Sequence, residues 1–274
     1  MSDPVPAPLL GAAPSGPDAP DLSVVLPMYE EAGNAGALVR EVAEALRGAG
    51  LSFEILAVDD ASTDGTREEL LAAKADVPEL RVVAHGRNAG QSRAVRTGVQ
   101  AARAPVVATL DGDGQNPPGD VAPLYRQLTR ADAPPLLGMV AGERQGRQDS
   151  QAKLVASRYA NRIRQGLLRD EARDTGCGLK LFRRDAFLRL PYFDHLHRYL
   201  PALMRREGFA VEFAPVSHRA RTVGESKYTN LGRSAVAMRD LVGVTWLLAR
   251  ARAPETIQEI EAPPQGEGPL EGEA

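Results

Sequence analysis

The sequence predicts an α/β fold in which helices cover a mostly parallel central sheet. Over residues 22–110, apolar runs alternate with helical patterns in the order β-α-β-α-β-α-β, and each apolar run ends in a polar cluster. The chain has 274 residues, of which 43% are hydrophobic and 25% charged, as is ordinary for a globular protein with one large domain or two small ones.

Four buried strands are predicted at residues 22–26, 53–58, 80–84 and 105–110. Pro27 stops the first of them. Helical spacing of apolar residues predicts helices over 38–46, 66–71 and 91–103, the second capped by Asp64 or Thr66.

The polar clusters that end the strands are Tyr29-Glu30, Asp59-Asp60, His85-Gly86-Arg87-Asn88 and Asp111-Gly112-Asp113. Because the carboxyl ends of parallel strands meet at one edge of a sheet, these side chains are expected to line one crevice, where ligands bind in such folds.

Asp111-Gly112-Asp113 has two carboxylates one residue apart, flanked by glycines. Divalent cations take carboxylate oxygens and share them with substrate phosphates, so this stretch predicts a metal–diphosphate site. A turn in which Asp and Gly serve only the backbone geometry is the alternative. The chain has neither a Gly-x-Gly-x-x-Gly nor a Walker loop, so any nucleotide would be held by side chains and a metal.

Residues 142–173 contain eight Arg or Lys against four acids. A helical pattern puts Lys153 and Ser157 on one face. Such a stretch can lie on an anionic membrane, bind a lipid phosphate, or be an ordinary solvated surface.

Further strands are expected at 179–182 and 211–216, and a helix over 193–204 with His197 and Arg198 facing the crevice. His195 and His197 are not expected to bind metal, since their spacing separates them around a helix.

Cys177, the single cysteine, is interpreted as a small buried hydrophobe in a reducing compartment. Arg219 to Lys227 would form a polar loop able to close over a diphosphate, with a solvated loop as the alternative.

The net charge of −3 is unevenly distributed: residues 1–20 carry −2, residues 251–274 carry −5 and the body carries +4. Both ends, 1–20 and 251–274, are expected to be disordered tails, and the first does not resemble a signal peptide. The apolar run 241–249 is too short to span a bilayer, so residues 231–250 are expected to form an interfacial helix anchored by Trp246, or one that packs on protein.

Taken together, these motifs resemble those of glycosyltransferase family 2, and more narrowly its polyprenyl-phosphate glycosyltransferases, the dolichol-phosphate mannose synthase type. The first half matches in Pro27-x-Tyr29-x-Glu31, Val58-Asp59-Asp60-x-Ser62-x-Asp64-Gly65-Thr66 and Asp111-x-Asp113-x-Gln115. The second half matches in Gly142-Glu143-Arg144, Asp174 to Lys180, His197 to Pro201, and Arg221 with Gly224-x-Ser226-Lys227-Tyr228. The resemblance implies a GT-A fold over residues 21–230.

The resemblance also implies roles for individual residues. Nucleotide-sugar contacts would come from Pro27, Tyr29, Glu31, Val58, Asp60, Asp111, Gly112, Asp113, Gln115, Arg144, Arg221 and Lys227. Mg²⁺ or Mn²⁺ would be held by Asp111, Asp113 and Gln115, with Asp113 the more direct ligand. The acceptor phosphate would contact Arg144, Lys153 and Ser157, and catalysis would rest on Asp111, Asp113, Arg221 and Lys227. Gly112 replaces a residue that is often alanine, a change expected to matter little.

The predicted activity is inverting transfer of a sugar from a GDP- or UDP-sugar to a dolichyl or undecaprenyl phosphate. It would occur at the cytoplasmic face of the membrane, with the protein bound peripherally, without nucleic acid and with a homo-oligomer or a membrane subunit as an optional partner. A hydroxyl acceptor is the alternative, and it would require a free carboxylate base. A sugar-nucleotide pyrophosphorylase is disfavoured because no glycine-rich loop follows the first strand. An inactive lipid- or partner-binding scaffold would be expected to lack the site acids.

Overall fold

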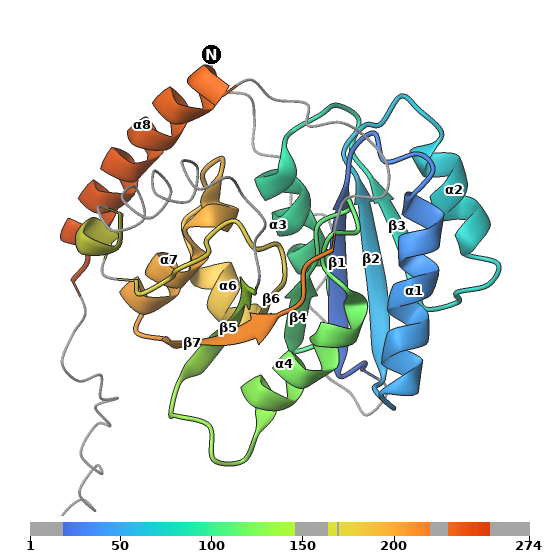
Figure 1. Ribbon diagram of the computed structural model, residues 1–274, viewed down its shortest axis with the longest axis horizontal. Helices are drawn as coiled ribbons and strands as arrows, with labels where there is room; N and C mark the ends of the chain where they lie inside the picture. Colours follow the sequence, from blue (N-terminus) through green and yellow to red (C-terminus); the bar gives the residue numbers. More distant parts are fainter. Residues whose placement is uncertain (1–18, 146–163, 169, 220–229, 253–274) are drawn as a thin grey trace, which may run out of the picture.

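The computed structural model describes residues 19–145, 164–168, 170–219 and 230–252. A seven-stranded sheet in the order β3-β2-β1-β4-β6-β5-β7 forms its centre (Figure 1). The strands are β1 (Leu22–Met28), β2 (Phe53–Asp59), β3 (Leu80–Ala84), β4 (Val106–Thr109), β5 (Leu137–Arg144), β6 (Lys180–Arg183) and β7 (Ala210–Val216). The helices are α1 (Ala35–Gly48), α2 (Thr66–Ala73), α3 (Gln91–Ala101), α4 (Val121–Thr129), α6 (Arg184–Arg189), α7 (Leu200–Arg206) and α8 (Asn230–Ala249), with 3-10 turns η1 (Pro118–Asp120) and η2 (Leu196–Arg198).

The predicted mostly parallel sheet is confirmed. Strands β1, β2, β3 and β4 pair in parallel, as do β5 and β7, and β6 runs antiparallel to both of its neighbours. The reversed β6 brings the residues before Lys180 to the edge where β4 ends, opposite Thr109.

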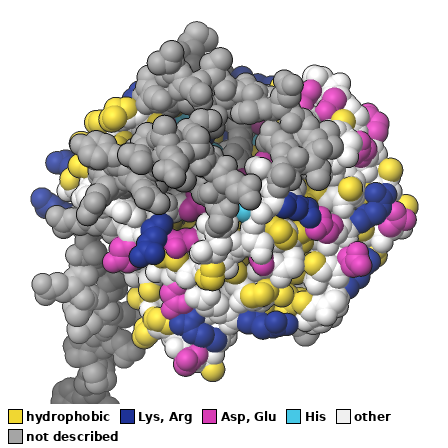
Figure 2. Space-filling view, viewed as in Figure 1, with side chains coloured by type: hydrophobic (Ala, Val, Ile, Leu, Met, Phe, Trp, Pro, Cys, Tyr) yellow, Lys and Arg dark blue, Asp and Glu magenta, His cyan; other side chains and the backbone are white. Residues whose placement is uncertain are grey.

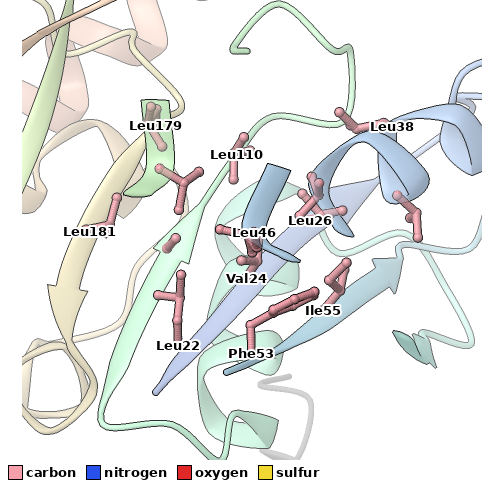
Figure 3. Packing of buried hydrophobic residues seen from close by; sticks show 14 of the residues in the cluster. Leu22, Val24, Leu26, Leu38, Leu46, Phe53, Ile55, Leu110, Leu179 and Leu181 are labelled. Carbon is pink, nitrogen blue, oxygen red and sulfur yellow. The ribbon is translucent and has the colours of Figure 1, made fainter. Parts of the chain in front are cut away.

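Two apolar layers enclose the sheet because side chains alternate between its faces along each strand. Val24 of β1 packs with α1, α2 and α4, whereas its neighbour Val25 packs with α3, α6 and α7. In the first layer, Val24 lies beside Leu46 of α1 (Figure 3). One face of α8 also packs on the second layer, through Val244.

The helix expected over 193–204 is interrupted. His195 has a left-handed backbone conformation, with φ 63°, and is followed by η2 and then α7. Pro201 explains the break, because it lacks the N–H that a continuous helix would donate to residue 197, yet it fits the first turn of α7. His197 and Arg198 therefore lie in the short turn η2 and not in a continuous helix.

α8 packs with one face and exposes the other. Leu241, Leu247 and Leu248 lie against the second layer, and Asp240 binds the ring of His195 at 2.8 Å. No helix within the described ranges is long and apolar enough to cross a membrane. The predicted tails, except for residues 19–20 and 251–252, lie outside the described part of the chain.

Lys and Arg side chains lie next to Asp and Glu over the described surface of the face shown in Figure 2. Pairs such as Arg47–Glu79 and Arg40–Asp76 are of this kind. Exposed pairs contribute little to stability, typically about 0–1 kcal/mol each. The buried layers therefore hold the sheet, and with it the site at its edge.

Candidate active site

The carboxyl ends of β1, β2 and β4 meet, as their parallel pairing requires. Pro27 lies opposite Val58 in the β1–β2 register, and the Leu110 N–H donates to the Val25 carbonyl at 3.2 Å. The N–H of Asp60 donates to the Met28 carbonyl at 2.8 Å. The predicted crevice is thus built on a continuous hydrogen-bonded edge.

Asp60 holds the loop that precedes α3 through a network of hydrogen bonds. Its carboxylate accepts the N–H groups of Ala89 and Gly90 at 2.9 and 2.7 Å, and the Nδ1 of His85 lies 2.6 Å away. Asp60 is almost fully buried, so this network fixes the loop that leads into α3. Its expected contact with a nucleotide base remains a prediction.

Two other residues predicted to bind the nucleotide differ in exposure. Val58 is completely buried in the second apolar layer, and its expected contact with the base remains a prediction. Tyr29 is 40% exposed at the end of β1, so its ring is accessible to a ligand. Glu31, two residues later, donates its N–H to the hydroxyl of Thr66 at 2.8 Å.

The loop that carries the two aspartates is closely packed. Asn34 donates to the carbonyl of Gly112 at 2.6 Å, and the Gln115 N–H donates to Asp113 at 3.1 Å. A Cβ on Gly112 would lie 2.7 Å from the Met28 sulfur and 2.8 Å from the Pro27 carbonyl. An alanine at this position would therefore require the backbone of β1 or the side chain of Met28 to shift.

Asp111 projects into a cavity of about 430 Å³ between β4, β6, α3 and η2. Gln91 at the start of α3 donates to its carboxylate at 2.7 Å. Gly178 packs directly on it, since a Cβ there would lie 2.3 Å from the Asp111 carboxyl carbon. The lining residues are Pro27, Gln91, Val95, Thr109, Asp111, Arg144, Thr175, Gly176, Cys177, Gly178, Lys180, His197, Arg198 and Leu200.

Asp111 and Lys180 carry opposite charges near each other: the Lys180 side chain is buried, and Asp111 is partly exposed in the cavity. Burial, reinforced by the charge of Asp113, raises the pKa of Asp111, while Lys180, Arg144 and Gln91 oppose the rise. Burial lowers the pKa of Lys180, and Cys177 and Asp111 oppose that change. The Lys180 ammonium also donates to the Cys177 carbonyl. Sequence reasoning did not single out Lys180 or Gln91, because neither has a distinctive spacing to the aspartates.

Arg144, expected to address phosphates, lies at the end of β5 and forms a two-pronged ion pair with Asp174. Its Nε and Nη2 donate to the two carboxylate oxygens at 2.6 and 2.8 Å. That hydrogen bonding raises the pKa of Arg144, so its charge is permanent. Arg144 lines the cavity, but much of its charge is balanced by Asp174.

The two histidines of the second half have separate partners. His195 binds Asp240 of α8, and the Nδ1 of His197 lies 2.7 Å from the hydroxyl of Ser92 in α3. Within the described residues no cluster of three His, Cys, Asp or Glu could hold a metal. Cys177 is fully buried, and burial raises the pKa of its thiol, as expected of an unreactive residue.

Asp111 and Asp113 nevertheless suit a magnesium or manganese ion. Their donor chemistry is that of hard divalent cations, which commonly use one or two carboxylates and complete their shell with water and substrate phosphates. The charge of Asp113 acts on the pKa of Asp111, so the two carboxylates are near enough to influence each other. Gln115 lies on the same loop, and its role as a ligand remains a prediction.

Arg219 ties the end of β7 to the aspartate loop. Its guanidinium pairs with Glu41 of α1 at 2.8 and 2.7 Å and donates to the Gly114 carbonyl. The Arg219 N–H donates to the Gln115 carbonyl at 3.1 Å. The predicted site residues Arg221, Lys227, Lys153 and Ser157 lie outside the described residues, so their roles remain predictions.

The fold and the acid-lined sheet edge define a GT-A glycosyltransferase, and the chain belongs to glycosyl transferase family 2, whose model matches residues 23–190. It is 32% identical over 235 residues to dodecaprenyl-phosphate galacturonate synthase of Rhizobium johnstonii, covering 83% of this chain and 67% of that protein. These findings confirm the resemblance to the polyprenyl-phosphate glycosyltransferases.

Solved structures share the fold. Glucosyl-3-phosphoglycerate synthase from Mycobacterium tuberculosis with uridine diphosphate matches at a TM-score of 0.61 and 18% identity, over 85% of this chain and 82% of that one. Mannosyltransferase PcManGT from Pyrobaculum calidifontis, in complex with GDP-Man and Mn²⁺, matches at a TM-score of 0.58 and 19% identity, over 92% and 68%. At these identities the likeness establishes the fold alone.

Proposed function

We propose that this glycosyltransferase moves a sugar from a nucleotide diphosphate donor to a polyprenyl phosphate, with inversion at the anomeric carbon. The observation that carries the proposal is the charge of the cavity. Of the described lining residues, Asp111 is the one carboxylate, against Arg144, Lys180 and Arg198. A cavity of this kind suits an anionic acceptor.

The absence of a second lining carboxylate bears on the acceptor. A hydroxyl acceptor needs a base to take its proton, whereas a phosphate monoester, with a second pKa near 6, is already mostly a dianion at neutral pH. Asp111 is the single carboxylate among the described lining residues, and it is engaged by Gln91 and by the charge of Lys180. A phosphate oxygen would attack the anomeric carbon while the bond to the donor's β-phosphate breaks.

The leaving nucleoside diphosphate develops negative charge, which must be offset. A Mg²⁺ or Mn²⁺ ion held by Asp111 and Asp113, with Gln115 as a further candidate ligand, would supply Lewis-acid stabilisation there. Arg221 and Lys227 would add fixed positive charge. Arg219, two residues before Arg221, donates to the Gly114 carbonyl beside Asp113, which supports this assignment.

The lipid acceptor implies a membrane surface, and α8 offers a face for it. Met238, Val242 and Trp246 recur every four residues and are 61%, 63% and 62% exposed. Arg239, Arg250 and Arg252 are exposed around this stripe. An apolar stripe with a tryptophan and flanking arginines suits the interface of an anionic bilayer, at the cytoplasmic face where nucleotide sugars are made.

A donor and acceptor panel tests the proposed reaction. Purified protein with Mg²⁺ or Mn²⁺ would be given UDP-glucose, UDP-galacturonate or GDP-mannose, with undecaprenyl phosphate or undecaprenol in detergent. UDP-galacturonate is included because a relative is named for galacturonate. Mass spectrometry should detect a glycosylated undecaprenyl phosphate with at least one donor.

Two other outcomes identify the rival functions. Transfer to undecaprenol but not to its phosphate would establish a hydroxyl acceptor. No transfer, together with no thermal stabilisation by any donor, would leave the scaffold hypothesis. Binding of a nucleotide sugar stabilises the folded state by mass action, so about 2.7 kcal/mol is expected at 100 times the dissociation constant.

A further inference from the structure

η2 presents two polar residues to the cavity that Asp111 also lines. The left-handed backbone at His195 turns the chain, and Leu196 is buried beneath the turn. His195 binds Asp240, and the hydroxyl of Tyr199 donates to the Ala237 carbonyl at 3.3 Å, so α8 braces both sides of η2. His197 and Arg198, between these braces, line the cavity.

Ser92 of α3 holds both the ring and the backbone of His197. The His197 backbone N–H donates to the Ser92 hydroxyl at 3.4 Å, and that hydroxyl lies 2.7 Å from the His197 Nδ1. The Ser92 hydroxyl can donate its proton to Nδ1, an arrangement that leaves the ring proton on Nε2.

With Nδ1 accepting from Ser92, His197 is a neutral donor at the cavity. Burial, and then the charges of Lys180, Arg198 and His195, lower the pKa of His197 well below its usual value. Nε2 has no hydrogen-bond partner among the residues that the structure describes. An N–H donor of this kind is suited to an oxygen atom of a ligand.

Arg198 supplies the positive charge beside it. Lys180 lies next to Asp111, and Arg144 is paired with Asp174. The Arg198 guanidinium, by contrast, has no ion pair or hydrogen bond to any other described residue. Among the described cations of the cavity, Arg198 is the one whose charge a ligand would balance.

We propose that Arg198 and the Nε2–H of His197 bind the acceptor phosphate inside the cavity, with Ser92 as the residue that positions His197. A guanidinium and a neutral N–H donor together match the oxygens of a phosphate monoester. The proposal rests on the proposed transfer to polyprenyl phosphate. It adds η2 and α3 to the acceptor site, which the resemblance assigned to Arg144, Lys153 and Ser157.

Steady-state kinetics of R198Q with farnesyl phosphate as a short acceptor test this assignment. Removing a charge-assisted hydrogen bond should raise the KM for farnesyl phosphate by about tenfold or more, with R198K intermediate and the KM for the donor little changed. S92A should raise the same KM by a smaller factor, because Nδ1 could then carry the proton. R40Q, which removes an exposed arginine paired with Asp76 on α1, is the matched control and should behave as wild type.

Direct binding separates this proposal from the proposed function. Isothermal titration of farnesyl phosphate into UDP-bound protein should give at least tenfold weaker binding for R198Q than for wild type, with equal melting temperatures. Weaker binding in a protein that transfers no sugar would support the anion site while refuting the reaction. An unchanged KM and affinity in R198Q would overturn the proposal. So would a defect confined to the KM of an acidic donor such as UDP-galacturonate, since Arg198 would then bind the sugar carboxylate.

Discussion

Gly178→Ala should abolish most activity without unfolding the protein. The new Cβ would lie 2.3 Å from the carboxyl carbon of Asp111 and 2.3 and 2.6 Å from its two oxygens. Ordinary carbon contacts begin near 3.5 Å, so the carboxylate must move by about 1 Å. A displacement of that size in a catalytic group costs on the order of 100-fold in rate.

The fold should tolerate this change. Asp111 borders a cavity, so its side chain can rotate away, and Gly178 does not have a positive φ. The assay is kcat/KM for sugar transfer together with the melting temperature of each variant. G176A is a graded comparison, because its Cβ would lie 3.1 Å from the Arg144 Nη2, and G86A is a control with no atom within 4 Å. Activity of G178A within a few-fold of wild type would refute the reasoning, and so would equal losses in all three variants.

Three further predictions follow from the geometry. D113A should abolish metal-dependent transfer while the protein remains folded, and full retained activity would refute the metal assignment. D59N should lower the free energy of unfolding at pH 7 by about 1–3 kcal/mol, since the buried carboxylate accepts from Ser62 and Arg67. Burial would raise the Asp59 pKa, but these hydrogen bonds outweigh it and lower the pKa below 3.8, so the stabilisation is present above pH 3.8 and should fade as the pH falls through the lowered value. W246E should reduce co-sedimentation with anionic vesicles while transfer to farnesyl phosphate in detergent is unchanged, and equal sedimentation would refute the membrane face.

The first half of the fold was predictable because each element there has a simple pattern. Apolar runs such as 53–58 are completely buried strands, and turn residues separate them from the helices. β5 and α4 were not predicted. β5 includes Gly138 and Gly142, which weaken the apolar pattern. A Cβ at Gly138 would lie 2.7 Å from Phe209, and one at Gly142 would lie 3.0 Å from the Leu179 carbonyl and from Val216.

Part of the site was predictable for the same reason. The alternation of strands and helices was enough to bring Asp60 and Asp111 to one edge. Contacts such as Ser92 with His197 join residues more than 100 positions apart, and no local pattern encodes them. The place of Lys180 in the site could not be predicted either, because nothing in the sequence indicates that this lysine lies near Asp111.

The sheet edge is divided by charge, and the division follows the order of the strands. The β1, β2 and β4 ends contribute the acids Glu31, Asp60, Asp111 and Asp113, while β5, β6 and η2 contribute Arg144, Lys180 and Arg198. Asp111 is the acid at the boundary between the two halves. It accepts a hydrogen bond from Gln91, and the charge of Lys180, from the basic half, opposes the rise of its pKa. A metal-bound diphosphate suits the acidic half and a bare phosphate the basic half. A sugar transferred between them would therefore pass Asp111, and crowding this one carboxylate with the Cβ of G178A should remove most of the transfer activity.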